Sequence, residues 1–110
     1  MRRVSINSFF RVVGPRLVAL ITSGPLDDAN AMAATWHSPI SFDPPLYGVS
    51  VSPKRATHSI IRETESFGVN LMPYEMVDSA HTCGRISKSE LRDKLEIAGI
   101  KVFEGPELGV

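Results

Sequence analysis

A short apolar run at residues 17–22, Leu-Val-Ala-Leu-Ile-Thr, lies between two chain-breaking segments, Gly14-Pro15 and Ser23-Gly24-Pro25. Its length suits a strand better than a helix, and the glycines and prolines mark both of its ends. Because the apolar residues follow one another without polar alternation, the run predicts a strand buried on both faces. Residues 24–30 predict the turn that follows it.

Prolines also govern the next stretch, because Pro39 and the pair Pro44-Pro45 disfavour a helix in residues 31–41. Residues 46–52 alternate, which predicts a strand with two different faces. One face is apolar and is expected to join the core. The other is small and hydroxylated, and it either leaves room for a ligand beside the backbone or faces solvent. The apolar face consists of Tyr47, Val49 and Val51, and the small face of Gly48, Ser50 and Ser52.

A helix and then a strand are predicted from the next apolar pattern. Residues 57–66 predict the helix, and alternation in residues 67–71 predicts the strand, which ends before Pro73. The helix is expected to turn Ile60 and Ile61 inward and Arg62, Glu63 and Glu65 outward, and the strand carries Phe67, Val69 and Leu71.

Two more helices are predicted in the last third of the chain. Residues 74–83 predict a short one, and the capping-box spacing of Ser87 and Glu90 predicts another that runs to about Ala98 and ends at Gly99. The remaining features are the apolar group Met76, Val77 and Ala80, the surface pair Glu90 and Lys94, and a last strand beginning with Ile100, Val102 and Phe103.

These elements predict one domain over residues 1–110, in which strands dominate the first half and short helices separate the later strands. The order lacks the regular strand–helix–strand alternation of a parallel sheet. A mainly antiparallel α+β or barrel-like sheet is therefore expected.

Charge excludes one broad class of function. Twelve Lys and Arg balance twelve Asp and Glu, whereas a general nucleic-acid binder needs a cationic face. The first 26 residues nevertheless contain four arginines and no acid. This basic lobe either faces an anionic ligand or is simply solvated. Its arginines are Arg2, Arg3, Arg11 and Arg16.

The single cysteine, Cys83, excludes an internal disulfide and is compatible with a reducing cytoplasm. The longest aliphatic run, residues 17–21, is far too short to span a bilayer. The residues after Met1-Arg2-Arg3 do not form the apolar segment of a secretory signal. A cytoplasmic protein without a membrane partner is expected.

A strand-to-helix junction is the first candidate site: Ser52-Pro53-Lys54-Arg55-Ala56-Thr57-His58. A helix N-terminus presents unpaired N–H groups and a partial positive charge, which attract phosphate. Lys54 and Arg55 add two full charges, and Ser52 and Thr57 add hydroxyl donors. The alternative is an ordinary turn with two solvated cations.

The segment Asn30-Ala31-Met32-Ala33-Ala34-Thr35-Trp36 is the second candidate site. Small side chains allow a flat ring to lie against the backbone, whose groups can bond the polar edge of a flavin. Asn30 and Thr35 add polar side chains, and Trp36 offers a stacking face. The alternative is a core strand with one buried tryptophan.

Other kinds of chemistry find little support. A zinc site needs about four ligands, and His81 and Cys83 form only a pair, with His37 and His58 isolated. A lone cysteine such as Cys83 is usually packed and inert. The motifs of α/β-hydrolases, P-loop NTPases and Rossmann dinucleotide-binding proteins are absent from the sequence.

From about Pro15 onward, the ordered set of motifs resembles the N-terminal part of flavin reductase-like proteins, flavoredoxin among them. The run at residues 15–22 and the Asn30–Trp36 segment resemble the opening of that family, and residues 38–46, Ser-Pro-Ile-Ser-Phe-Asp-Pro-Pro-Leu, resemble its most distinctive run. Val49-Ser50-Val51-Ser52-Pro53-Lys54-Arg55 with Thr57, then Phe67-Gly68-Val69-Asn70 and Cys83-Gly84-Arg85-Ile86-Ser87, follow in the same order.

The resemblance implies a mostly antiparallel, Greek-key-like split β-barrel with short helices that binds FMN, usually as a homodimer with the flavin near the subunit interface. It implies that Asn30 and Trp36 lie near the isoalloxazine ring, that backbone groups of Met32, Ala33, Ala34 and Thr35 line it, and that Ser50 and Ser52 lie under the ring and ribityl chain. It further implies that Lys54, Arg55, Thr57 and His58 surround the phosphate, that Cys83, Gly84, Arg85 and Ser87 approach from another loop, and that Lys94 reaches the flavin.

The function implied by the resemblance is that of an oxidoreductase in which NAD(P)H reduces bound FMN, which passes electrons to a downstream acceptor, such as an electron-acceptor protein. No side chain need act as acid or base, because the chemistry belongs to the cofactor. Family members run well past residue 110, and their later part completes the barrel. Two alternatives therefore stay open: a non-enzymatic FMN-binding electron carrier and a truncated, cofactor-free fragment.

Overall fold

The computed structural model describes residues 3–87 and 94–102 of the chain. In chain order the elements are η1 (Ile6–Arg11), β1 (Ala19–Ser23), η2 (Leu26–Asp28), β2 (Asn30–Ala34), β3 (His37–Ser41), β4 (Leu46–Val49), α1 (Ala56–Thr64), β5 (Gly68–Leu71), η3 (Tyr74–Met76), α2 (Val77–Arg85) and α3 (Lys94–Ile97), where η marks a 3₁₀ helix. None of the described helices is long and apolar enough to cross a membrane.

The main sheet has three antiparallel strands in the order β2-β1-β5. In the centre, Ile21 lies opposite Met32 on one side and Val69 on the other. The prediction of a strand buried on both faces is confirmed for β1, since Ala19, Leu20 and Ile21 are each at most 2% exposed. The strand begins two residues later than predicted, because β2 ends at Ala34, the partner of Ala19.

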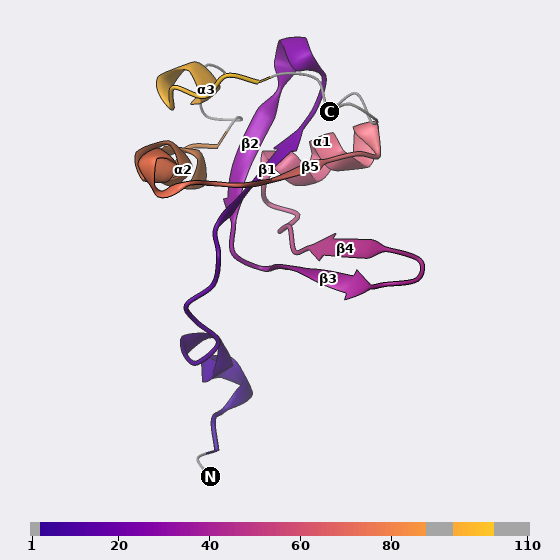
Figure 1. Cartoon of the computed structure of the whole chain (residues 1–110), viewed down its shortest axis with the longest axis vertical. Coiled ribbons are helices and arrows are strands. Elements are labelled where there is room, and N and C mark those ends of the chain that lie inside the picture. Colours follow the sequence, from indigo (N-terminus) through magenta and orange to yellow (C-terminus); the bar gives the residue numbers. More distant parts are fainter. Residues whose placement is uncertain (1–2, 88–93, 103–110) are drawn as a thin grey trace.

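A second sheet consists of the antiparallel hairpin β3-β4, which projects to one side of the molecule (Figure 1). Its register shifts between Pro39 and Ser41. The strand predicted over residues 46–52 ends at Val49. Placing Tyr47 in the core was wrong: its side chain is 42% exposed and stacks on the His37 ring with centroids 5.9 Å apart, because the hairpin leaves the main sheet.

The core has two parts, one on each face of the main sheet. On one face, Leu20 and Ala31 pack with Ala80 and Cys83 of α2, and with Ala98. The other face is covered by the end of β4, by the connection that follows it and by α1. Helices α1 and α2 lie on opposite sides of the β1–β2 ribbon (Figure 1). The second cluster contains Ala19, Ile21, Met32 and Ala34, with Val49, Val51, Ile61 and Phe67 packed against it.

The predicted helices form with shifted ends. Residues 57–66 become α1, which ends where Glu65 adopts a left-handed conformation with φ of 54°. Residues 74–83 become a 3₁₀ turn followed by α2, which continues to Arg85. The strand predicted at residues 67–71 is confirmed as β5. As expected, Arg62, Glu63 and Glu65 are exposed, whereas Ile60 and Ile61 are partly buried.

The expectation that Gly99 ends the last helix is also confirmed. Gly99 has a φ of 68°, and its N–H bonds the Glu96 carbonyl while the Ile100 N–H bonds the Leu95 carbonyl. This is the Schellman arrangement that a glycine after a helix permits. Of that helix the structure describes only Lys94–Ile97, so the Glu90 capping and pairing predictions lie outside the described residues. Residues 100–102 are not a strand, and Phe103 lies outside the described part.

The N-terminal segment extends away from the two sheets (Figure 1). It contains η1, whose preceding residue Ser5 accepts a hydrogen bond from the Asn7 N–H through its hydroxyl. No residue of η1 is buried. The segment reaches the sheets through residues 13–18, which run directly into β1.

Candidate functional site

A groove of about 430 Å³ lies between the end of β2 and the β4–α1 connection. We call it the central groove. It brings together eight of the predicted cofactor-binding residues, from two segments that are separated in the sequence by the hairpin. Its lining residues are Met32, Ala33, Ala34, Thr35, Trp36, Ser50, Val51, Ser52, Pro53 and Arg55.

Strand pairing explains why β2 forms one wall of this groove. Within the described residues, β2 pairs with β1 alone and is an edge strand of its sheet. An edge strand carries a row of backbone N–H and C=O groups without a strand partner. Because Ala33 and Ala34 have only methyl side chains, a planar ligand can approach this backbone closely.

Trp36 lines the groove between β2 and β3. Its side chain is 52% exposed, and its ring lies 6.4 Å from the Phe9 ring at an interplanar angle of 38°. The alternative interpretation, a buried core tryptophan, is therefore wrong. The Trp36 carbonyl accepts a hydrogen bond of 2.9 Å from the Ser50 N–H, which fixes the distance between the two walls.

The connection that leads into α1 lines the groove as far as Arg55. Ser52 organises the approach to α1: its hydroxyl accepts from the Lys54 N–H at 3.3 Å, and its carbonyl accepts from the Arg55 N–H at 3.0 Å. Arg55 is the N-cap residue, and its side chain makes no capping hydrogen bond. The first N–H groups of a helix have no partner within it, so this end favours an anion.

Beneath the helix start lies a much smaller pocket of about 10 Å³, large enough for about one water molecule. Asn30 donates from Nδ2 to the Thr57 hydroxyl over 2.8 Å, and both residues are at most 2% exposed. The Thr57 side chain therefore points inward, away from the central groove. The pocket is lined by Asn30, Met32, Arg55, Ala56, Thr57, Cys83, Ile86, Ser87 and Lys94.

Cys83 and Lys94 are buried in this inner pocket, at 2% and 4% exposure. Burial raises the pKa of the Cys83 thiol, and the positive charge of Lys94 opposes part of that rise. The thiol is therefore protonated at neutral pH, which suits a packed side chain and not a nucleophile. The described residues contain no cluster of three metal-ligating side chains.

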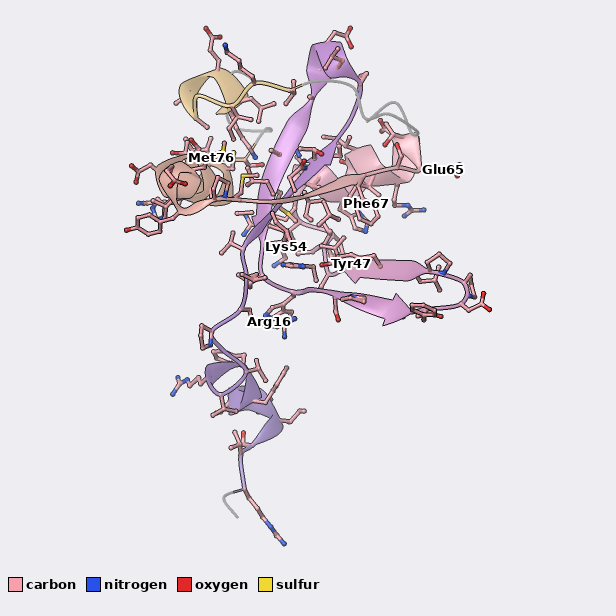
Figure 2. All side chains as sticks on the ribbon, in the orientation of Figure 1. Arg16, Tyr47, Lys54, Glu65, Phe67 and Met76 are labelled. Carbon is pink, nitrogen blue, oxygen red and sulfur yellow. The ribbon has the colours of Figure 1, made fainter. Side chains whose placement is uncertain are left out.

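Four predicted site residues lie outside both the groove and the inner pocket. Lys54 is exposed on the connection, where Figure 2 labels it, and His58 faces a separate cavity with Tyr47 and Phe67. Gly84 and Arg85 line another cavity, beside Tyr74 and Val77 of the α2 region. A side chain added at Gly84 would meet the Ala33 methyl at 3.3 Å, so this glycine lets α2 approach β2 closely.

The structure also reveals a residue that sequence reasoning did not place at the site. Arg16 donates from Nε to the Thr35 carbonyl at 2.8 Å and from Nη2 to the His37 carbonyl at 3.1 Å. Figure 2 shows Arg16 where the N-terminal segment meets the start of the hairpin. The sequence signals for Arg16 were its place among the four arginines of the basic lobe and its position just before the buried strand.

Known proteins resemble this chain over its whole described length. The family model described as "Flavin reductase like domain" matches residues 13–110. An uncharacterized protein of Aeropyrum pernix is 32% identical over 109 residues, which are 99% of this chain and 41% of that protein.

Two solved structures place the fold. A flavoredoxin from Methanosarcina acetivorans is 30% identical with a TM-score of 0.82, covering 100% of this chain and 55% of its own. An FMN-binding protein from Thermus thermophilus is 29% identical with a TM-score of 0.73, over 84% of this chain and 52% of its own. The chain thus spans about half the length of the proteins it matches. It belongs to the flavin reductase-like family, and its mostly antiparallel strands with short helices are those of the FMN-binding split barrel.

Proposed function

We propose that this chain is an FMN-binding oxidoreductase domain, in which NAD(P)H reduces bound FMN and the electrons pass to a downstream acceptor. Membership of the flavin reductase-like family supports a flavin function. The observation that carries the proposal for this chain is the central groove. It joins a small-residue strand edge, a half-exposed tryptophan and a helix N-terminus with an adjacent arginine in one continuous surface.

The residues of the groove fit the parts of FMN. The free edge of β2 offers backbone donors and acceptors to the pyrimidine side of the ring, and Trp36 offers an aromatic face. Ser50 and Ser52 lie on the opposite wall, where the ribityl chain needs hydroxyl partners. Bound FMN supplies the hydride and electron chemistry, so this protein's residues orient the ring and exclude water.

The phosphate is expected on the groove side of the α1 start, near Ser52 and Arg55. Arg55 lines the groove, and the charge of Lys54 next to it adds electrostatic attraction. Thr57 does not fit a direct phosphate contact, because its buried hydroxyl already bonds Asn30. We assign the pair Asn30 and Thr57 to holding β2 against α1.

The inner pocket gives Cys83, Ser87 and Lys94 a supporting position under the helix start. We expect the buried Lys94 to add positive charge beneath the helix start. Direct contact of these residues, or of Gly84, Arg85 and His58, with flavin stays a prediction.

Titration with flavins tests the proposal. FMN is added to the apoprotein while the fluorescence of Trp36, the only tryptophan, is followed, and riboflavin serves as the matched ligand without phosphate. We expect saturable quenching by both and tighter binding of FMN. Absence of quenching and of a bound flavin absorbance band would remove the proposed function.

A second measurement separates an enzyme from an electron carrier, which the similarity to a flavoredoxin favours as the alternative. A reductase oxidises NADH or NADPH in the presence of FMN at steady state, whereas a carrier binds FMN without such turnover. We also propose a homodimer, supported by exposed apolar side chains such as Phe9, Leu17 and Trp36. Sedimentation equilibrium with and without FMN measures it.

A further inference from the structure

Three successive carbonyl groups at the junction of β2 and β3 are each held by a donor from elsewhere in the chain. The Thr35 carbonyl accepts from Arg16 Nε at 2.8 Å, and the His37 carbonyl accepts from Arg16 Nη2 at 3.1 Å. The carbonyl between them, that of Trp36, accepts from the Ser50 N–H at 2.9 Å. One guanidinium group thus brackets the backbone on both sides of Trp36.

The segment before β1 and the start of β3 are joined a second time, this time by a side chain of β3 that bonds the backbone before β1. His37 Nε2 lies 2.9 Å from the Leu17 carbonyl, which can only accept, so Nε2 must carry a proton. In the neutral ring, Nδ1 then accepts from the Tyr47 hydroxyl at 2.6 Å. Arg16 therefore holds the backbone around Trp36, and His37 holds the backbone next to Arg16.

The position of Trp36 matters because its side chain borders two cavities. It lines the central groove, and it lines a neighbouring cavity of about 450 Å³ together with Phe9 and Val13. Ser50 is shared by both cavities as well. A displacement of the Trp36 backbone would change the wall of the groove directly.

We propose that Arg16 is a positioning residue of the central groove: its guanidinium clamps the carbonyls of Thr35 and His37 and so fixes the aromatic wall formed by Trp36. Its planar fork matches two carbonyls at a fixed spacing, which a lysine ammonium cannot reproduce. Arg16 acts through the backbone, because its Nε and Nη2 donors are directed at these carbonyls.

The inference rests on the proposed function only in calling the groove a flavin site, and its first test needs no flavin. Trp36 is the only tryptophan, so its fluorescence reports on this junction alone. We expect Arg16→Ala to lower the fluorescence anisotropy of the apoprotein and to raise its quenching by acrylamide. Low concentrations of guanidinium should restore both values, and Arg16→Lys should restore them only in part.

Arg11→Ala is the matched control, since Arg11 belongs to the same basic segment and lies over the Phe10 ring at 5.8 Å. It should leave Trp36 fluorescence unchanged, with or without guanidinium. Thermal melts monitored by circular dichroism check that each variant folds. If Arg16→Ala does not fold, Arg16→Lys gives the same comparison with the charge retained.

The second test compares two flavins. Because the clamp acts on the ring wall, Arg16→Ala should weaken FMN and riboflavin equally, by about tenfold. Unchanged Trp36 fluorescence in Arg16→Ala, or wild-type behaviour of Arg16→Lys, would overturn the inference. A loss confined to FMN would also overturn it, by making Arg16 a phosphate ligand. If wild-type protein binds neither flavin, the proposed function fails while the apoprotein comparison still decides the role of Arg16.

Discussion

Asn30 and Thr57 join the edge strand of the main sheet to the first turn of α1 through a buried hydrogen bond of 2.8 Å. Asn30 donates from Nδ2, while its Oδ1 has no hydrogen-bond partner among the described residues. An amide with one unmet polar atom in the interior is costly, and this one lines the inner pocket beneath the start of α1. The pair therefore links the stability of the fold to the geometry of the site.

Asn30→Ala is expected to lower the free energy of unfolding by about 1–3 kcal/mol, since it leaves the Thr57 hydroxyl buried without its donor. Thr57→Val should have a similar cost, because it leaves the Asn30 amide without its acceptor. Urea denaturation measures both. Asn7→Ala, on the exposed N-terminal segment, is the control and should change stability by less than about 0.5 kcal/mol.

A double-mutant cycle tests whether the two residues act on each other. Removing both polar groups together should cost less than the sum of the single changes, with a coupling energy of about 1 kcal/mol. Additive losses would show that Asn30 and Thr57 stabilise the protein independently.

Arg55 and Lys54 are adjacent in the sequence but differ in their relation to the groove, which only Arg55 lines. Arg55→Ala should weaken FMN about tenfold more than riboflavin, since only FMN carries a phosphate. Lys54→Ala should weaken the binding of FMN about threefold more than that of riboflavin, because Lys54 acts only through screened long-range attraction. Isothermal titration calorimetry measures all four affinities.

Arg62→Ala is the charge-matched control for this pair, because Arg62 is exposed near the other end of α1. It should leave the FMN-to-riboflavin ratio unchanged. Equal losses of FMN and riboflavin in Arg55→Ala would exclude a phosphate role for Arg55.

Trp36 is half exposed, which separates its expected effect on stability from its effect on binding. Trp36→Ala should lower the free energy of unfolding by less than about 1.5 kcal/mol, whereas a fully buried aromatic residue would cost about 3–5 kcal/mol. It should change the fluorescence and visible circular dichroism of bound flavin, and Trp36→Phe should change them less. Tyr74→Ala, at 86% exposure, serves as the control and should leave the flavin spectra unchanged. Flavin spectra that do not respond to Trp36→Ala would exclude a stacking role for Trp36.

The sequence predicted the elements whose signals are local. The run at residues 17–22 is apolar, short and enclosed by glycine and proline, and most of it forms β1. Gly99 ended a helix as expected, since glycine adopts the left-handed conformation without steric cost. Residues 30–34 were harder: alanine has little strand preference, and they form β2 because they pair with β1.

Long-range geometry decided what could not be predicted. Alternation placed Tyr47 and Val49 on one face, but only the departure of the hairpin from the main sheet shows that Tyr47 is exposed. The resemblance brought the groove residues together in advance. It could not predict that Thr57 turns inward to Asn30, or that Arg16 bonds carbonyls 19 and 21 residues away, because both depend on how β1, β2 and α1 pack.

The buried thiol of Cys83 should make stability depend on pH in the alkaline range. Burial raises the pKa of this thiol in the folded protein, so the unfolded chain ionises first as the pH rises. The stability contributed by the protonated thiol is fully present below the unfolded pKa, about 8.5, and is lost as the pH rises through the folded pKa. Cys83→Ala removes this contribution. The difference in unfolding free energy between wild type and Cys83→Ala should therefore be constant near neutral pH and shrink as the pH rises above the unfolded pKa. A difference that stays constant throughout would place the thiol in contact with water, and rapid modification of the folded protein by a thiol reagent would do the same.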